Sequence, residues 1–455
     1  MFSKETYIER RKELKSNMKS GVLLFLGNDE CGMNYRDNTY HFRQDSTFLY
    51  FFGLQYSGLA AIIDIDEDKE IIFGDELTTD DIVWMGIQPT LKEKAAMAGV
   101  TDTRPSKEFY DYVGTVVKQG RTVHYLPPYR AEHQIKYSAI SGMQSILPSE
   151  LFIQSLVKQR SYKSAEEIEE IERACDVTTD MHLAAYRSLQ IGMKEYEVAS
   201  IIEAVAKSAG CNLSFPTIAT VKGQTLHNHY YGNTVKEGDM LLLDAGAETS
   251  MGYAGDMSST ICAGKKFTSR QKDIYDIQVA SHMAAVNALK PGVPFEDVYD
   301  LSCRTICEGL KSLGLMRGNV YDAVKEGAHA MFFPCGLGHM MGLDVHDMEN
   351  YGEKWVGYDG REKSKQFGRK SLRLARPLEP GFVLTIEPGI YFIPELMDLW
   401  RAEKRFEDFI NYDKLESYRD FTGLRNEEDY LITTNGYRRL GKKKPITIEE
   451  VEAMR

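Results

Sequence analysis

The first third of the chain alternates short apolar runs with longer polar stretches. Mostly apolar runs occupy positions 21–26, 60–65, 70–73 and 122–126, and turn-forming residues separate them. Runs of this length are typical of strands buried in a sheet, and the polar stretches between them have the composition of helices. The pattern therefore predicts an α/β domain at the N-terminus, with strands at these four positions.

A polar connector near residue 160 marks a change in the pattern. Ser164 lies three residues before Glu167, which is the spacing of a reciprocal capping box at the start of a helix. An apolar stripe at helical spacing follows, and Gly192 supplies a stop signal. We therefore expect a long helix here and a domain boundary that divides the chain into residues 1–160 and 161–455.

The second part of the chain repeats one plan. Three positions between helical stretches recur one hundred residues later: Leu189, Gly192 and Val198 return as Leu289, Gly292 and Val298. Each half then continues with strands, expected at 240–246 and 253–262 in the first half and around 383–391 and 428–433 in the second. Chance similarity between two helix pairs is the alternative. The matching order of elements favours a duplication with a cleft along its pseudo-twofold axis.

Acidic residues stand in or next to each of these four strands. Asp244 and Glu387 each end an apolar run, and Asp256 lies on the strand that follows Asp244. At the fourth strand, alternation places Glu427 and Glu428 on opposite faces. A buried carboxylate is costly unless it is paired or bound to a metal. A salt bridge or a turn would explain any single acid, but four acids in symmetric halves favour one shared site.

His339 lies in a glycine-rich segment between these acids. Glycine lets backbone segments approach closely, so the imidazole can enter a crowded site. Four carboxylates and one imidazole form a hard, oxygen-rich set that suits paired divalent cations such as Mn²⁺, Fe²⁺ or Co²⁺ better than a closed thiolate zinc site does. The seven cysteines are scattered and form no C-x-x-C motif, which argues against a zinc knuckle and a disulfide framework.

Composition and charge exclude several classes of protein. The 455 residues include 55 Lys and Arg against 67 Asp and Glu, a formal net charge of −12, which argues against a nucleic-acid partner. With 43% apolar and 27% charged residues, the chain has the composition of a globular protein rather than a disordered one. The charged N-terminus lacks a signal core, and no run is long enough to span a membrane. We therefore expect a cytoplasmic protein.

Five motifs in a fixed order resemble those of the creatinase/aminopeptidase family, whose fold is called the pita-bread fold. They are LLLDAGAE, GYAGDMSST, GLGHMMGLDVHD, VLTIEPGIY and GLRNEEDYLIT. Within the family they are most similar to the proline-specific branch, which contains aminopeptidase P and prolidase. Residues 40–50 of this chain resemble part of the N-terminal domain of that branch. The resemblance implies an α/β (α+β) fold, with a creatinase-like domain in residues 1–160 and a pseudo-twofold pita-bread metallopeptidase domain in residues 161–455. It also implies a homodimer.

The resemblance assigns roles to individual residues. It implies two divalent metal ions, with Mn²⁺ favoured over Co²⁺, Fe²⁺ or Zn²⁺, and five ligands: Asp244, Asp256, His339, Glu387 and Glu427. It further implies that His227 and His346 contact the substrate near the scissile bond. Glu387 would also relay a proton to the leaving nitrogen, and Arg425 would lie beside the last ligand.

The chain departs from the family pattern at two residues and in one hairpin. Cys335 stands where a histidine is usual, and Asn426 stands where an aliphatic residue is usual. The hairpin between Asp244 and Asp256 is one residue longer than the common form. Cys335 removes a group that could form hydrogen bonds or carry protons, while the implied ligand set is complete.

The resemblance implies hydrolysis of the peptide bond before a proline at the second position of small peptides. A dipeptidase must bind the carboxylate that follows this proline, and arginine is well shaped for that task. Arg373 lies in a segment that resembles the prolidase segment with such an arginine. We therefore favour an Xaa-Pro dipeptidase over an Xaa-Pro aminopeptidase acting on longer peptides. A metal-free creatinase-like amidinohydrolase and a non-catalytic peptide-binding module are more distant alternatives, because neither needs all five ligand positions.

Overall fold

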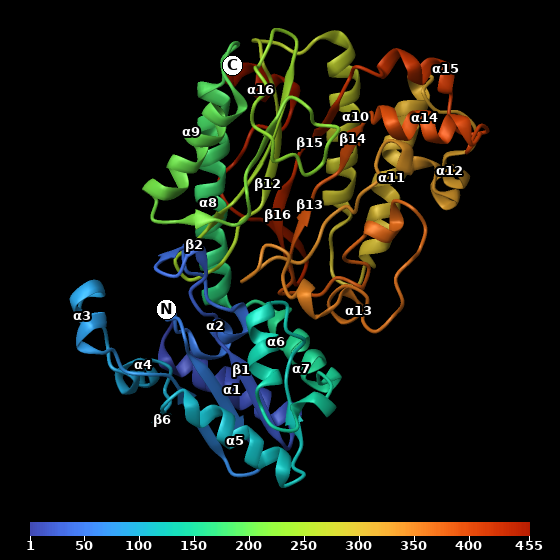
Figure 1. Cartoon of the computed structure of the whole chain (residues 1–455). Coiled ribbons are helices and arrows are strands. Elements are labelled where there is room, and N and C mark those ends of the chain that lie inside the picture. The colour runs from blue at the N-terminus through green and yellow to red at the C-terminus, as the bar shows by residue number, and fades with distance from the viewer. The chain divides into compact units, whose positions relative to one another are not determined.

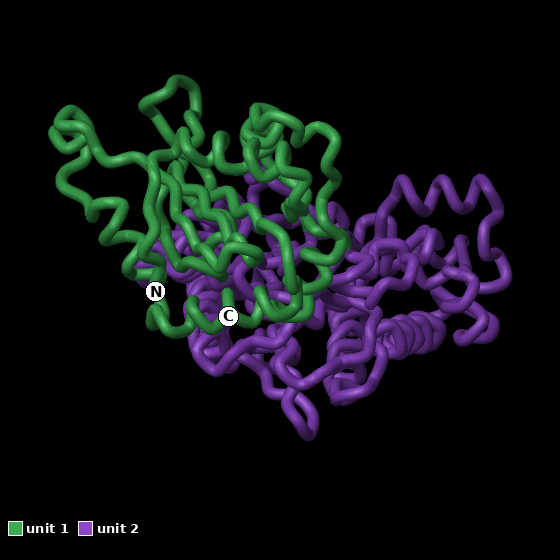
Figure 2. Tube along the Cα trace, turned by 90° about the horizontal axis from the view of Figure 1, so that it is seen from below, with its two compact units in different colours: residues 1–160, 350–352 green, residues 161–349, 353–455 purple.

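The computed structural model describes residues 1–455, and the chain forms two compact units (Figure 2). Unit 1 contains residues 1–160 and 350–352, and unit 2 contains residues 161–349 and 353–455. Unit 1 therefore includes one short segment from the second half of the sequence. None of the helices combines the length and the apolar character that a membrane span requires.

Unit 1 is built on a five-stranded mixed sheet in the order β6-β5-β4-β1-β7 (Figure 1). β4 pairs antiparallel with β1 and β5, while β7 and β6 pair parallel with β1 and β5 at the two edges. The elements are α1 (Lys4–Met18), β1 (Val22–Leu26), β2 (Gly32–Tyr35), β3 (Asn38–Thr39), α2 (Ser46–Phe52), β4 (Ala60–Asp64), β5 (Lys69–Phe73), α3 (Thr79–Met85), α4 (Leu91–Met97), β6 (Asp102–Arg104), α5 (Lys107–Lys118), β7 (Val123–His124), α6 (Ala131–Ser138), the 3-10 turn η1 (Met143–Ser145) and α7 (Glu150–Arg160).

The four strands predicted for the N-terminal third are confirmed as β1, β4, β5 and β7. β6 and the β2–β3 hairpin are short and polar, so apolar runs could not predict them. Every residue of β1 is buried, and Phe109, Val113 and Val116 form the buried face of α5 in the same apolar cluster. One apolar cluster of unit 1 therefore lies between the sheet and α5, and on the other face of β1 Phe25 packs against Phe51, Phe52 and Phe152.

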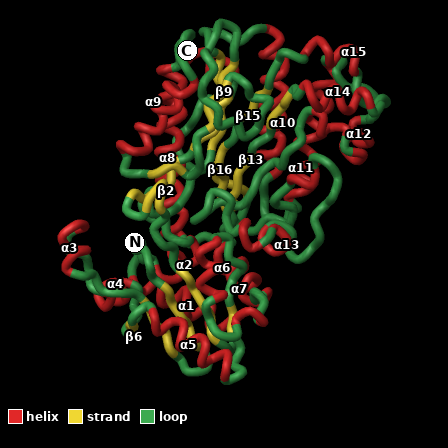
Figure 3. Tube along the Cα trace, viewed as in Figure 1, coloured by secondary structure: helices red, strands yellow, loops and turns green.

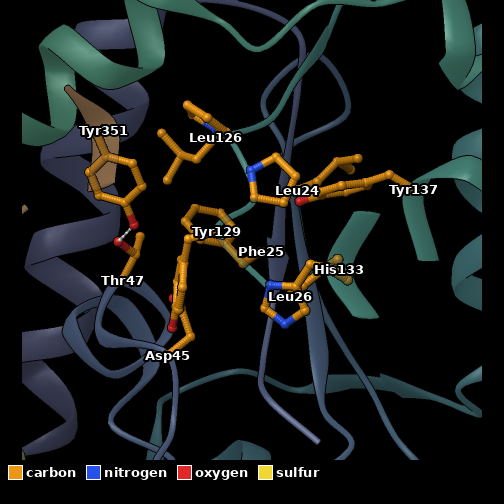
Figure 4. Close-up of a pocket in the computed structure, with 12 residues that line it drawn as sticks. Leu24, Phe25, Leu26, Asp45, Thr47, Leu126, Tyr129, His133, Tyr137 and Tyr351 are labelled. Carbon is orange, nitrogen blue, oxygen red and sulfur yellow. Dashed lines mark hydrogen bonds between the residues drawn. The ribbon is translucent and has the colours of Figure 1, made fainter. Parts of the chain in front are cut away.

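A cavity of about 30 Å³ lies at the edge of this core (Figure 4). Residues of β1, the segment 126–129 and α6 line it, together with Tyr351 from the segment 350–352. The Tyr351 hydroxyl lies 2.5 Å from Oγ1 of Thr47, which fastens this segment within unit 1. The cavity is far smaller than the pockets that hold organic ligands.

Unit 2 has its strands in the middle and its long helices on the outside (Figure 3). The helices α8 and α9 pack together, as do α10 and α11, and the two pairs lie on different sides of the strands (Figure 1). The helices of unit 2 are α8 (Ala165–Ser188), α9 (Glu195–Ser208), α10 (Ser269–Ala288), α11 (Phe295–Ser312), α12 (Val320–Glu326), α13 (Glu353–Val356), α14 (Pro394–Ala402), α15 (Tyr412–Leu415) and α16 (Ile448–Met454). Its 3-10 turns are η2 (Ala328–Met331), η4 (Arg369–Ser371) and η5 (Glu416–Tyr418), while η3 (Glu349–Tyr351) spans the division between the units.

The strands of unit 2 form two three-stranded antiparallel sheets, β12-β10-β9 and β13-β16-β17, and two shorter pairs. They are β8 (Asn212–Leu213), β9 (Ile218–Thr220), β10 (Met240–Ala245), β11 (Ala247–Glu248), β12 (Met257–Cys262), β13 (Val383–Ile386), β14 (Gly389–Tyr391), β15 (Gly423–Arg425), β16 (Glu428–Thr433) and β17 (Gly436–Arg439). The strand expected around 383–391 is two strands, since Pro388 has no N–H to continue the ladder. The strand expected at 253–262 begins only at Met257.

The two halves of unit 2 follow the same plan. Each begins with a long helix, α8 or α10, that opens with a capping box, as predicted at Ser164 for α8. The N–H of Gly192 donates to the carbonyl of Val235 at 2.8 Å, and the N–H of Gly292 donates to the carbonyl of Leu378 at 2.8 Å. Equivalent bonds at positions one hundred residues apart support the predicted duplication.

Candidate active site

Two acids come from the sheet of the first half. β10 and β12 pair antiparallel with Asp244 opposite Ser258, and Asp256 lies two residues before Ser258. Because side chains two residues apart share a face, Asp256 and Asp244 are diagonal neighbours on the same side of the sheet. Both carboxylates are buried.

Two further acids come from the sheet of the second half. β13 and β16 pair antiparallel with Ile386 opposite Glu428, so Glu387 and Glu427 lie together just beyond the end of this ladder. Glu428 points to the other side of the sheet, where the Tyr430 hydroxyl donates to its carboxylate at 2.9 Å. The alternation expected for Glu427 and Glu428 is therefore present.

His339 is held against the strand that carries Glu387. A Cβ on Gly338 would lie 2.0 Å from the carbonyl oxygen of Thr385, so only glycine permits this approach. The ring Nδ1 of His339 lies 3.1 Å from the carbonyl oxygen of Met340 and donates to it. Nε2 therefore faces the acids, 3.3 Å from Oδ2 of Asp256 and 3.9 Å from Oε1 of Glu387.

All five predicted ligands line one cavity of about 550 Å³. Its walls contain Phe215, Pro216, Ile218, Leu226, His227, His229, Asp244, Asp256, Pro334, Cys335, Gly336, Gly338, His339, Val345, His346, Ser371, Arg373, Glu387, Arg425 and Glu427. One ligand atom each from Asp256, His339 and Glu427 lies within 4.8 Å of the others. Asp244 instead pairs with Arg425, whose Nη2 lies 2.6 Å from its Oδ2.

The cavity holds more negative charge than its own residues balance. Burial raises the pKa of Asp256, of Glu387 and of Glu427, and neighbouring carboxylates raise each of them further. Burial lowers the pKa of His339, which favours the neutral imidazole that can bind a metal. Oδ1 of Asp244 is buried and has no hydrogen-bond partner.

These donors fit hard divalent cations. Four carboxylates with one neutral imidazole are the oxygen-rich set that Mn²⁺, Fe²⁺ and Co²⁺ accept. Cations among them would supply a partner for the orphaned oxygen of Asp244 and remove the repulsion that raises the carboxyl pKa values. The residues of the cavity are therefore suited to hold metal.

Arg425 connects the two sheets, and it does so through residues that the sequence did not single out. Its Nε donates to Oγ of Ser258 at 2.9 Å, and its Nη1 donates to the Tyr391 hydroxyl at 2.7 Å. The Ser258 hydroxyl in turn donates to Oε2 of Glu427 at 2.7 Å. Side chains two residues apart on a strand share a face, so the position of Ser258 two residues after Asp256 was the signal that could have identified it.

The predicted substrate residues also lie on the cavity wall. His227 and His229 lie in the same exposed loop, and both line the cavity. The ring of His346 stacks on that of His339, with centroids 3.7 Å apart and planes 13° from parallel. Arg373 lines the cavity as well, and its Nη1 contacts Glu349 and lies 3.3 Å from Oε1 of Glu353.

Cys335 occupies the cavity wall beside these groups. Burial raises the pKa of its thiol to about 12, and the charge of Glu387 adds to the rise. The thiol is therefore protonated at neutral pH and cannot carry protons as an imidazole would. All seven cysteines of the structure are free.

The comparisons with known proteins agree with this geometry. The model of metallopeptidase family M24 matches residues 169–434, and that of the aminopeptidase P N-terminal domain matches residues 7–125. Human Xaa-Pro dipeptidase is 30% identical over 469 residues, which cover 99% of this chain and 92% of that protein. A probable Xaa-Pro aminopeptidase of Aspergillus clavatus is 28% identical and covers 92% of this chain and 89% of its own length.

The whole fold is also found in a solved structure. A single-residue variant of Escherichia coli aminopeptidase P in complex with substrate superposes with a TM-score of 0.82 at 27% identity, covering 100% of this chain and 98% of that one. The architecture is thus the two-domain pita-bread arrangement, with an N-terminal aminopeptidase P domain before the metallopeptidase domain. The chain belongs to metallopeptidase family M24.

Proposed function

We propose that this chain is a metal-dependent Xaa-Pro dipeptidase, which hydrolyses the bond between a first residue and a proline at the second position. One observation carries the proposal: the five residues of the implied ligand set line one cavity, with three further histidines and two arginines on its walls. The full-length similarity to human Xaa-Pro dipeptidase supports the substrate class. The family and the filled ligand positions argue against a metal-free amidinohydrolase and a non-catalytic module.

The five ligand residues would hold two divalent cations, for which we propose Mn²⁺. Such cations polarise a scissile carbonyl and lower the pKa of water bound to them. Asp256, His339 and Glu427 have ligand atoms close enough to share one cation. Arg425 holds Asp244 and, through Ser258, orients Glu427. We also propose that residues 161–455 form the catalytic domain and residues 1–160 the N-terminal domain.

Glu387 is the residue we assign to proton transfer. Its carboxylate lies at the cavity beside His339 and its side chain is 22% exposed, so it is placed to take up a proton and release it to the leaving nitrogen of proline. His346 and His227 lie on the wall where the substrate carbonyl and amino terminus would be bound. The apolar side chains of Phe215, Ile218 and Val345 exclude water from part of the same cavity.

Arg373 supports the dipeptide form of this function, because a guanidinium on the wall can bind the carboxylate after proline. Xaa-Pro aminopeptidase activity on longer peptides is the second candidate. The observation that favours it is that Arg373 is already paired with two carboxylates, and the fold similarity to aminopeptidase P is consistent with it. Homodimeric assembly and a cytoplasmic location are further predictions from the resemblance.

The test is hydrolysis of Ala-Pro and Ala-Pro-Ala by purified protein before and after chelation. We expect cleavage only with divalent metal, and a rate on Ala-Pro at least equal to that on Ala-Pro-Ala. The Arg373→Ala variant should lose about tenfold on Ala-Pro and less on the tripeptide, since one charged hydrogen bond is worth about 1.5–3 kcal/mol. Cleavage without metal would refute the metallopeptidase proposal, and an unchanged dipeptide rate in the variant would remove the reason for preferring dipeptides.

A further inference from the structure

Glu349 contacts two residues of the candidate site at once. Its Oε2 lies 2.5 Å from Nδ1 of His346, and its Oε1 contacts Nη1 of Arg373. The side chains of all three residues are about one third exposed, and two of them, His346 and Arg373, line the cavity. Glu349 therefore joins the histidine near the metal ligands to the arginine assigned to the end of the substrate.

The charge around Arg373 is already balanced. Glu349 and Glu353 both face its guanidinium, and Glu353 also contacts Nζ of Lys363. These two carboxylates and two cations sum to zero before a substrate binds. A carboxylate that follows proline would enter beside Glu349 and meet its negative charge at short range. A peptide that continues past proline brings no such charge.

The segment that precedes Glu349 is held in place by its own contacts. Asp347 forms a buried ion pair with Lys163, with 2.9 Å between its Oδ2 and Nζ. Met348 follows with φ of 61°, a left-handed conformation that is unfavourable for a non-glycine residue. The surrounding structure thus imposes the turn that directs Glu349 to His346 and Arg373.

We propose that Glu349 is a specificity-determining residue: its charge beside Arg373 weakens the binding of a free carboxylate after proline and so narrows the preference for Xaa-Pro dipeptides over longer peptides. This inference rests on the proposed function, because it concerns the choice between Xaa-Pro dipeptides and longer peptides in the same cavity. Glu349 also acts as a positioning residue for His346. A carboxylate only accepts at 2.5 Å, so Nδ1 of His346 carries the ring proton and Nε2 is the acceptor.

Two substitutions separate the two roles. Glu349→Gln removes the charge but keeps a carbonyl oxygen that can accept from Nδ1 of His346. Glu349→Ala removes both. Glu353→Gln is the matched control, since it also neutralises an acid on Arg373 but touches no histidine. Each variant is compared with the unchanged protein in its Mn²⁺-loaded form.

The first readout is binding rather than turnover. Calorimetry with L-proline and L-prolinamide compares two ligands that differ in the carboxylate. We expect Glu349→Gln to tighten L-proline about tenfold, equivalent to about 1.4 kcal/mol, and to leave L-prolinamide within about twofold. Equal changes for the two ligands, or weaker binding of L-proline, would overturn the selecting role. The control variant Glu353→Gln should also tighten the binding of L-proline, but by a smaller factor, because Glu353 pairs with Lys363 as well as with Arg373.

The second readout is kcat on Ala-Pro-Ala. Glu349→Gln should keep kcat within about twofold, whereas Glu349→Ala should lower it about tenfold through the lost orientation of His346. Equal kcat values in the two variants would overturn the positioning role. If the unchanged protein cleaves neither peptide with metal, the proposed function fails, yet the binding measurement still decides the role of Glu349.

Discussion

Glu427 and Glu428 are consecutive acids with opposite surroundings. Glu427 faces Asp256 and Glu387 in the cavity, and burial together with these carboxylates raises its pKa. Glu428 faces His282, Tyr430 and Arg439 behind the sheet. Burial opposes its ionisation as well, but the nearby His282 and the charge of Lys444 prevail and lower its pKa to about 2.

The difference between the two acids separates a binding site from a structural ion pair. The protein gives Glu428 its counter-charges, so the fold is complete on that side of the sheet. On the cavity side several carboxylates lie close together, and Arg425 is the main cation among them. The positive charge is too small to balance the carboxylates, and a metal ion can supply the rest. A buried acid surrounded by other acids is therefore the better indicator of function.

Glu427→Gln should have the largest effect on activity. It removes one ligand charge while keeping the shape of the side chain, so we expect about a thousandfold loss of kcat/KM, equivalent to about 4 kcal/mol of transition-state stabilisation. Metal content per chain should fall in parallel, as measured by elemental analysis. A variant that keeps both metal and activity would show that Glu427 is not a ligand.

Glu428→Gln should act on stability instead. It leaves the charges of Arg439 and Lys444 without their carboxylate, and breaking a buried pair in this way costs about 3 kcal/mol. Urea unfolding of the metal-loaded variant measures this loss. Metal content and kcat should match those of the unchanged protein, and a loss of metal equal to that of Glu427→Gln would erase the distinction between the two faces.

The comparison also predicts that pH has a small effect on stability, of opposite sign for the cavity acids and for Glu428. Asp256, Glu387 and Glu427 have raised pKa values in the folded chain, so their contribution to stability is present below the ordinary carboxyl pKa and is lost as pH rises through the raised values. Glu428 has a lowered pKa, so its contribution is present above the ordinary value and is lost as pH falls toward 2.

Chelator-treated protein should therefore unfold about 3 °C lower at pH 8 than at pH 6, the shift that about 1 kcal/mol produces in a domain of this size. Scanning calorimetry measures this difference. Metal-loaded protein should not show it, because bound cations replace the protons. A chelated protein whose stability rises between pH 6 and 8 would mean that the cavity acids do not repel one another in the folded chain.

The sequence predicted most of the framework because its signals are local. Apolar runs located the four N-terminal strands, and the capping box located the start of α8 at Ser164. Strand alternation was sufficient to assign Glu427 and Glu428 to opposite faces. The break at Pro388, by contrast, was hidden inside one apolar run, although it explains how Glu387 leaves the sheet and faces the cavity.

The contacts that tune the site could not be predicted because they depend on distant segments. Ser258 joins Glu427 and Arg425 across 169 and 167 positions of the chain. A glutamate such as Glu349 is usually a surface residue, and no motif around it in the sequence indicates that it pairs with both His346 and Arg373. Such residues carry no pattern of their own, since their roles arise from the fold.

The most direct test of the central claim is a metal titration of chelated protein with Ala-Pro as substrate. We expect no hydrolysis without metal, activity that rises with added Mn²⁺, and saturation when two ions are bound per chain. Glu427→Gln should bind fewer ions and stay inactive in the same titration. Hydrolysis of Ala-Pro by the metal-free protein, or full metal loading without any hydrolysis, would contradict that claim.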